Sequence, residues 1–156
     1  MGCAPLCICA SPDTPIATPN GDVPIAQLRA GDLVFSVDHD AVKVVPLLRA
    51  HRTAVRHHHV EHIELANGIV LEISGGHPTA DGRTFADLRA GAKLDGVTVT
   101  SAKSVAYDSD YTYDILPASD TGTYFAGGLL IGSTLYQRSP ALPANPSPVK
   151  PADSAR

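Results

Sequence analysis

The sequence predicts an all-β fold. Apolar or alternating runs of a few residues recur at close spacing, and Gly, Pro, Asn and Asp bound them, which is typical of strands joined by tight turns. No stretch of helix length keeps an i, i+3, i+4 apolar period. The chain has 156 residues, of which 44% are hydrophobic, so it can bury the core of one domain.

The clearest strand signals lie in five segments, each apolar or alternating along its length. They are 33–37 (LVFSV), 60–65 (VEHIEL), 69–74 (IVLEIS), 97–107 (VTVTSAKSVAY) and 112–116 (TYDIL). Only 25–31 (IAQLRAG) and 85–91 (FADLRAG) look like single helical turns, and each ends in glycine. The last twenty residues, 137–156, contain five prolines among Ser, Ala and Asn. This composition has little to bury and predicts a disordered tail.

The two helical turns belong to an internal repeat. Residues 24–31 realign sixty positions later with residues 84–91, and five of the eight positions are identical. Each copy follows a glycine-containing turn and precedes an apolar strand. A duplicated half-domain is the simplest explanation, so we expect two related β halves that are intertwined.

Charge and hydropathy exclude two classes of partner. The net charge is −4 and the basic residues are scattered, whereas a nucleic-acid binder would show clustered Lys and Arg. No apolar run approaches the roughly 18 residues that a spanning helix needs. We expect a monomer that binds no nucleic acid and does not span a membrane, and the compartment stays open.

All three cysteines, Cys3, Cys7 and Cys9, lie within the first nine residues, so they cannot staple distant parts of the fold. They must act locally. One hypothesis is a structural zinc site in which the three thiolates and His77 are the ligands.

A set of motifs in a fixed order resembles a known family. They are Cys9 to Ile16, the strand 70–74 running into Ser74-Gly75-Gly76-His77, then Thr112 to Ile115, and Gly127 to Ser133. Together they resemble the Hint domain that inteins, bacterial intein-like proteins and the autoprocessing part of hedgehog proteins share. The resemblance covers about residues 9–134. It implies a pseudo-twofold all-β fold that activates the peptide bond before its own first cysteine.

In that family Cys9 would be the first residue and the nucleophile, and Ile8-Cys9 the scissile bond. The chemistry is sound by itself, because a thiol reaches the preceding carbonyl through a five-membered ring at high effective molarity. The resemblance assigns His77 to protonate the leaving nitrogen. It assigns Ser74 to polarise or position the scissile peptide, and Asp114 to orient the histidine or tune the thiol.

The chain also departs from the intein pattern. Gly132 and Ser133 stand where inteins end in His-Asn, so cyclisation of an asparagine is impossible. We therefore expect an N-to-S acyl shift and N-terminal self-cleavage without splicing. The substrate would be the chain's own upstream polypeptide, and water or an external nucleophile would be the acceptor, with no cofactor. The expected division is a flanking segment 1–8, a Hint-like domain 9–136 and the tail 137–156. A catalytically degenerate interaction domain is a further alternative.

A histidine cluster, His57-His58-His59 with Glu61 and His62, offers metal-ligating side chains on both faces of a strand. Its spacing matches no standard zinc signature. We expect a solvated strand edge that gains charge below about pH 6.5.

Overall fold

The computed structural model describes residues 9–136, which form eleven β-strands and two single-turn 3-10 helices. This confirms the all-β prediction. The strands are β1 Pro15–Thr18, β2 Gly21–Pro24, β3 Leu33–Asp38, β4 Ala41–Ala54, β5 His59–Leu65, β6 Val70–Ile73, β7 Lys93–Leu94, β8 Val97–Ala106, β9 Tyr111–Pro117, β10 Tyr124–Ala126 and β11 Leu129–Ile131. The helices are η1 Ile25–Gln27 and η2 Phe85–Asp87. The predicted tail, 137–156, lies outside the described residues.

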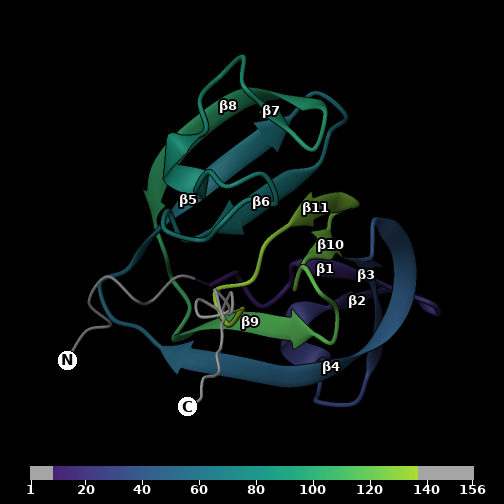
Figure 1. Ribbon diagram of the computed structural model, residues 1–156. Coiled ribbons are helices and arrows are strands. Elements are labelled where there is room, and N and C mark those ends of the chain that lie inside the picture. The colour runs from purple at the N-terminus through teal and green to yellow at the C-terminus, as the bar shows by residue number, and fades with distance from the viewer. Residues whose placement is uncertain (1–8, 137–156) are drawn as a thin grey trace, which may run out of the picture.

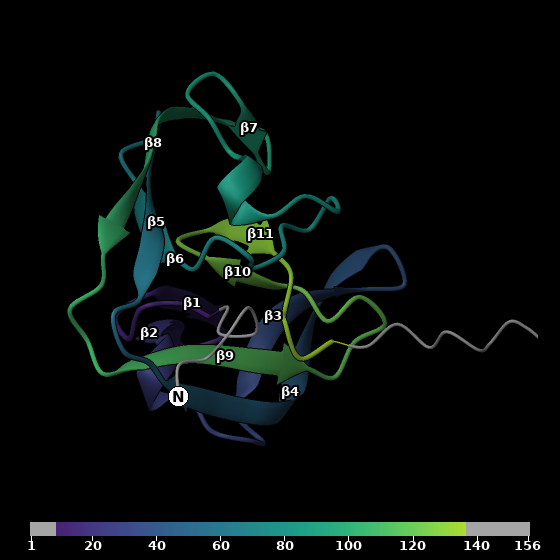
Figure 2. The ribbon, with the colours of Figure 1, turned by 90° about the vertical axis from the view of Figure 1, so that its left-hand side faces the viewer.

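Antiparallel pairing joins the strands into three sheets, in the orders β11-β10-β1-β2, β3-β4-β9 and β6-β5-β8-β7. In Figure 1 the third sheet forms an upper lobe, and β4 and β9 run along the base of a lower one. Figure 2 shows β10 and β11 between these two groups. The first sheet therefore connects the lobes, and it joins the start of the domain (β1) to its end (β10 and β11).

The longest strand, β4, was not among the clearest sequence signals. Its apolar run lacks strict alternation and contains Pro46, which has no N–H for a ladder. The structure places Pro46 where the strand changes partner: β4 pairs with β3 from Ala41 to Pro46, and with β9 from Leu47 onward. A proline is tolerated there because its missing N–H falls where the strand changes partner. Its carbonyl still accepts a hydrogen bond from the Ala118 N–H (2.9 Å).

The sequence repeat folds into the same local structure twice. Leu28 and Leu88 each close a 3-10 turn with a backbone bond to the residue three positions before. Gly31 and Gly91 follow with φ of 93° and 94°, a left-handed conformation that favours glycine. Each glycine N–H then donates 2.8 Å to a strand carbonyl, that of Leu47 or of Val99.

The strand pairing shows the same twofold relation. His51 of β4 pairs with Asp114 of β9, and Lys103 of β8 pairs with His62 of β5 in the corresponding register. The backbone hydrogen bonds just beyond these two strand pairs also correspond. Val55 N donates to Asp110 O in one half and Tyr107 N donates to His58 O in the other, both at 2.9 Å. Strand β4 thus corresponds to β8, and β9 to β5. The expected pseudo-twofold of intertwined halves is confirmed.

The approximate axis passes through the isolated bridge between Ala10 and Ile73. On one side of it Ser74 N donates to Cys9 O (3.0 Å), and on the other Ser11 N donates to Glu72 O (3.1 Å). Cys9 and Glu72 are therefore equivalent positions, as are Ser74 and Ser11.

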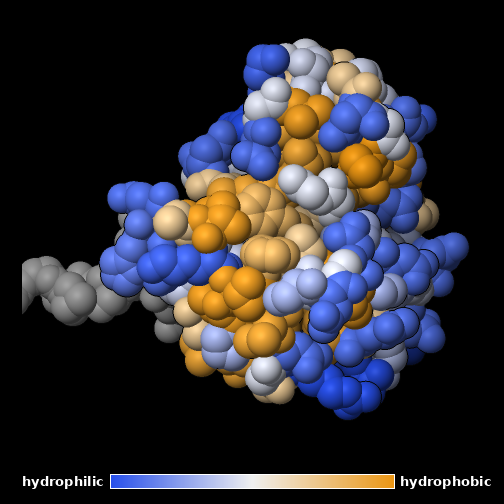
Figure 3. Space-filling model, turned by 90° about the vertical axis from the view of Figure 1, so that its right-hand side faces the viewer, coloured by the Kyte–Doolittle hydropathy of each residue, from blue (hydrophilic) through white to orange (hydrophobic). Residues whose placement is uncertain are grey.

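One apolar cluster fills the interior of both lobes, and large members such as Tyr124, Phe85 and Ile63 are fully buried. Most large apolar side chains that stay exposed belong to β3 and β4. On the face drawn in Figure 3, hydrophobic side chains form patches among hydrophilic ones. Within residues 9–136 no helix has the length and apolar character of a membrane span.

Candidate active site

The backbone around Cys9 is held on both sides. Ala10 forms β-bridges to Ile73 and to Tyr113, and it exchanges two backbone hydrogen bonds with Tyr113, of 2.7 and 2.8 Å. Cys9 itself is 3% exposed. The first described residue of the domain is thus fixed inside the protein, although it precedes the first strand.

Ser74 follows β6 and holds the carbonyl of Cys9. Its N–H donates to Cys9 O at 3.0 Å, and its hydroxyl donates to the same oxygen at 2.9 Å. The sequence predicted that Ser74 acts on the scissile peptide. Ile8, which supplies that carbonyl, lies outside the described residues, so the contact that the structure establishes is to Cys9.

His77 is fully buried at the end of a tight turn, in which its N–H donates to the Ser74 carbonyl (3.0 Å). Its ring lies edge-on to Phe85 and Tyr124. Nε2 is 2.8 Å from the carbonyl oxygen of Gly132. Because a carbonyl can only accept, Nε2 carries a proton, and the acid–base function of the ring falls to Nδ1.

Asp114 is the buried acceptor at the centre of the site. One carboxylate oxygen accepts from the Tyr124 hydroxyl (2.7 Å) and from its neighbour Ile115 N–H (2.8 Å). The other accepts from the Thr134 N–H (2.7 Å) and from the Thr134 hydroxyl. The latter oxygen is 4.0 Å from His77 Nδ1. Four donors thus orient Asp114 beside the histidine.

Burial raises the pKa of the Cys9 thiol to about 11, and the negative charge of Asp114 contributes. The hydroxyls of Thr112, Thr53 and Thr134 lower the pKa and only partly offset these effects. The Thr112 hydroxyl is buried and has no other hydrogen-bond partner among the described residues. At neutral pH Cys9 is therefore a protonated thiol that needs a base to become a nucleophile.

Burial and the charge of Asp114 also raise the pKa of Tyr124 well above its usual value. This tyrosine therefore stays a neutral donor to Asp114, and its hydroxyl is also 3.5 Å from His77 Nε2.

The structure brings Cys9, Ser74, His77 and Asp114 together from distant parts of the chain. It also adds groups that the sequence did not single out, namely Tyr124, Thr134, Thr112 and Thr53. The sequence contained a signal for placing Thr112 in the site, because residues two apart on a strand share a face and Asp114 was already a candidate. Tyr124 and Thr53 had none, since only tertiary packing brings their strands to the site.

Comparison with known proteins agrees with this geometry. The family model for the Hint domain matches residues 8–72. The fold is similar to the solution structure of a bacterial intein-like domain from Clostridium thermocellum, with a TM-score of 0.69 and 22% identity over 80% of this chain and 97% of that one. The described chain therefore has the Hint fold, and its first half matches the family model of the Hint domain.

Two inteins give similar matches to this Hint domain. The MchDnaB-1 intein is 24% identical, with a TM-score of 0.64 over 81% of this chain and 98% of that one. The Msm DnaB1 intein splicing domain, solved with bound zinc, is 21% identical, with a TM-score of 0.64 over 79% and 98%. At these identities the likeness shows the fold. No curated protein matches the chain significantly.

The predicted solvated strand edge at the histidine cluster is wrong for His58. Only His59 and His62 belong to a strand, β5, and His58 precedes it. The His58 side chain is half-buried, and its Nε2 is 2.7 Å from the Ser74 hydroxyl oxygen. The sequence placed these histidines on a strand, where neighbouring side chains alternate, and so could not foresee a loop residue turned toward the site.

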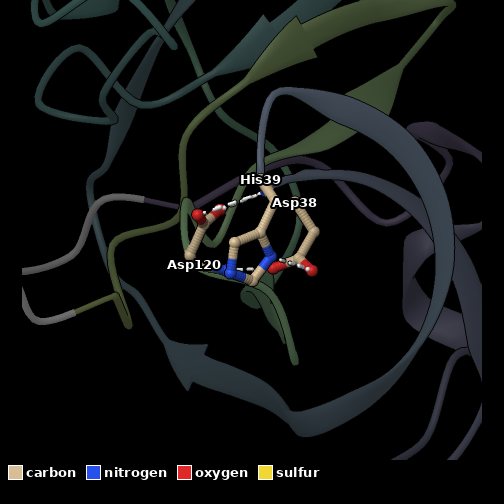
Figure 4. A group of neighbouring side chains, drawn as sticks. All are labelled: Asp38, His39 and Asp120. Atoms are coloured by element: carbon tan, nitrogen blue, oxygen red, sulfur yellow. Dashed lines mark hydrogen bonds and ion pairs between the residues drawn. The ribbon is translucent and has the colours of Figure 1, made fainter.

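One group in the described part of the Hint domain brings three metal-ligating side chains together: Asp38, His39 and Asp120 (Figure 4). Hydrogen bonds within the group already use these carboxylates. His39 Nδ1 is 2.8 Å from Asp38, the His39 N–H donates to both oxygens of Asp120, and the Asp120 N–H donates to Asp38 at 2.7 Å. The group ties the β3–β4 turn to the loop after β9.

The zinc hypothesis stays a prediction, because two of its four ligands are not among the described residues. Cys3 and Cys7 lie outside them. Cys9 and His77 belong to no group of three candidate ligands within residues 9–136. The thiol is surrounded by threonine hydroxyls instead.

Proposed function

We propose that this Hint domain cleaves its own chain at the Ile8-Cys9 bond through an N-to-S acyl shift. The observation that carries the proposal is the buried arrangement of Cys9, His77 and Asp114, in which a protonated thiol at the start of the domain lies in a site with an oriented imidazole. Ser74 holds the Cys9 carbonyl and so limits the movement of the thiol relative to the bond before it.

The proposed step begins when Cys9 Sγ attacks the carbonyl carbon of Ile8. His77 Nδ1 receives the thiol proton and returns it to the amide nitrogen of Cys9 as the C–N bond breaks. The products are a thioester between Ile8 and Sγ and a free α-amine on Cys9. The Gly132 carbonyl supports this role because it keeps the other ring nitrogen protonated, and the Asp114 carboxylate stabilises the transient imidazolium.

The reaction would end with N-terminal cleavage and not with splicing. Gly132 and Ser133 have no side-chain amide that could cyclise. In this structure Gly132 O contacts His77 and the Ser133 hydroxyl donates to Ile115 O (2.6 Å). Water or an external nucleophile would resolve the thioester. The upstream polypeptide is the substrate, with residues 1–8 as its junction with the domain.

A fusion tests the proposal. A stable reporter is joined upstream of Met1 of the full chain, and mass spectrometry follows the product with time, with and without a strong thiol or hydroxylamine. Release at Ile8 that thiol accelerates, and that Cys9→Ala abolishes, is the expected result. A Cys3→Ser/Cys7→Ser double variant should release the reporter at the native rate.

Two results would contradict the proposal. The first is an intact native fusion under reducing, metal-free conditions, which would favour a degenerate Hint domain that serves in an interaction. The second is zinc bound at equimolar ratio and lost in the Cys3→Ser/Cys7→Ser variant, which would favour the structural zinc module.

A further inference from the structure

His58 contacts the candidate site, although the sequence motifs did not include it among the site residues. It lies in the loop between β4 and β5, with its ring edge-on to Tyr107 at 5.8 Å between centroids. Its Nε2 is 2.7 Å from Ser74 Oγ. We propose that His58 is a positioning residue, which holds the Ser74 hydroxyl on the carbonyl of Cys9. Its kinetic consequence rests on the proposed function, whereas the hydrogen bond itself does not.

The single hydroxyl proton of Ser74 determines which side chain donates in the hydrogen bond between His58 and Ser74. A serine hydroxyl has one proton, and Ser74 donates it to Cys9 O at 2.9 Å. His58 must therefore donate through Nε2–H to the Ser74 oxygen. With the proton on Nδ1 instead, His58 would accept the hydroxyl proton, and the Cys9 carbonyl would keep only the Ser74 backbone N–H. The tautomer of His58 thus decides whether one donor or two hold Cys9.

The other half of the molecule shows that this contact is specific to the site. The pseudo-twofold makes Ser11 equivalent to Ser74, and Asp110 equivalent to His58. The Ser11 hydroxyl is 3.1 Å from the Thr14 hydroxyl, and Asp110 makes no hydrogen bond to Ser11 in the described chain. The same backbone therefore supports a His–Ser–carbonyl relay only where the cysteine stands.

The surroundings keep His58 neutral, which makes its tautomer the relevant variable. Burial lowers its pKa, and the neighbouring His59 contributes. Tyr107, which faces the ring from the loop after β8, remains an uncharged phenol because its own pKa is raised to about 12. A neutral imidazole can place its proton on either nitrogen, and the Ser74 oxygen favours Nε2.

Nitrogen NMR of the full chain, with ¹⁵N in its histidines, tests the contact independently of any cleavage. The native protein should show His58 as the Nε2–H tautomer at neutral pH, and Ser74→Ala should shift its ring nitrogen signals and weaken that preference. A Nδ1–H tautomer in the native chain would overturn the proposal. Ring signals that Ser74→Ala leaves unchanged would overturn it as well.

The reporter fusion tests the consequence for the rate. His58→Ala should slow thiol-induced release about tenfold, the effect of losing one orienting hydrogen bond. His58→Gln, whose amide N–H matches the reach of Nε2, should restore the rate to within about threefold of native. His58→Asn has a shorter reach and should not. His59→Gln is the matched control on the next residue, which is exposed, and it should cleave normally.

The outcomes separate the two proposals. If the native fusion cleaves but His58→Ala cleaves equally fast, or His58→Gln is as slow as His58→Ala, the positioning role fails and the proposed function stands. If the native fusion does not cleave, the proposed function fails together with any role of His58 in the rate. The NMR result then still decides whether His58 orients Ser74.

Discussion

The two halves of this Hint domain contain equivalent positions that carry different side chains. Around the candidate site they are Cys9, Ser74, His77 and Asp114. In the other half they are Glu72, Ser11, Thr14 and His62. The turns match, since Thr14 N donates to Ser11 O (3.2 Å) as His77 N donates to Ser74 O (3.0 Å). The first residue of η1 then donates to Thr14 O, and the first residue of η2 donates to His77 O. The backbone alone therefore does not make a reactive site.

The halves differ in how far they exclude water. Ser74, His77 and Asp114 are at most 1% exposed. In the other half, the Glu72 side chain is 40% exposed and pairs with a 25% exposed His62 at 2.8 Å. Ser11, Thr14 and Glu72 there line an open pocket of about 290 Å³. Electrostatic interactions strengthen as water is removed, so the same charge pair has a larger effect in the closed half.

The largest difference between the halves should appear in the rate of cleavage. His77→Gln removes the proton carrier and should slow reporter release by about 10²–10⁴-fold. Thr14→Val, at the equivalent position, should change the rate by less than about twofold. Single-turnover release from both fusions measures this, with circular dichroism to show that both fold. Equal slowing in the two variants would refute the division of roles.

The next largest effect should be on stability. Asp114→Asn places an amide NH₂ among four donors and should lower the free energy of unfolding by about 4 kcal/mol. His62→Gln disrupts a partly exposed pair and should cost less than about 1 kcal/mol. Urea unfolding of both variants gives the comparison, and similar losses would argue against it.

The loss of folding stability at alkaline pH should depend on Cys9 and not on Glu72, the equivalent residue of the other half. The folded state keeps the Cys9 proton until about pH 11, whereas the ordinary pKa of the thiol is 9.0. The unfolded chain therefore loses its proton first, and about 3 kcal/mol of stability should disappear as pH rises from 9 to 11. Unfolding measured across this range should show that loss in the native chain and in Glu72→Gln. Cys9→Ser should lack most of it, and an unchanged loss in Cys9→Ser would assign it to another group.

The smallest effect concerns a feature in which the halves are alike. Gly31→Ala and Gly91→Ala introduce a Cβ that meets nothing within 4 Å, so the cost is backbone strain at positive φ, about 1–2 kcal/mol each. The two losses should be equal and should add in the double variant. A difference above about 1 kcal/mol in thermal or urea unfolding would show that the repeats are not equivalent.

Local sequence pattern predicted the fold class and five of the eleven strands. All five segments with a clear strand pattern form strands, and the IAQLRAG and FADLRAG turns are 3-10 helices. Six strands lacked such a pattern. Strand β4 contains a proline at its change of partner, and β1, β2, β7, β10 and β11 span only two to four residues each. Motif order selected Cys9, Ser74, His77 and Asp114, which the fold brings together. It could not identify Tyr124 or His58, because each meets the site through packing between segments that no motif relates.

The position of the cysteine also has a consequence for its lifetime in the cell. Oxidants and alkylating agents attack a thiolate that they can reach, and Cys9 is both protonated and enclosed. The proposed cleavage occurs once per chain, so it requires that the sulfur is still intact when the reaction begins. The same enclosure that makes Cys9 a weak nucleophile at rest would preserve it through peroxide exposure, and would allow the protein to be stored in air without loss of the thiol that the proposed cleavage needs.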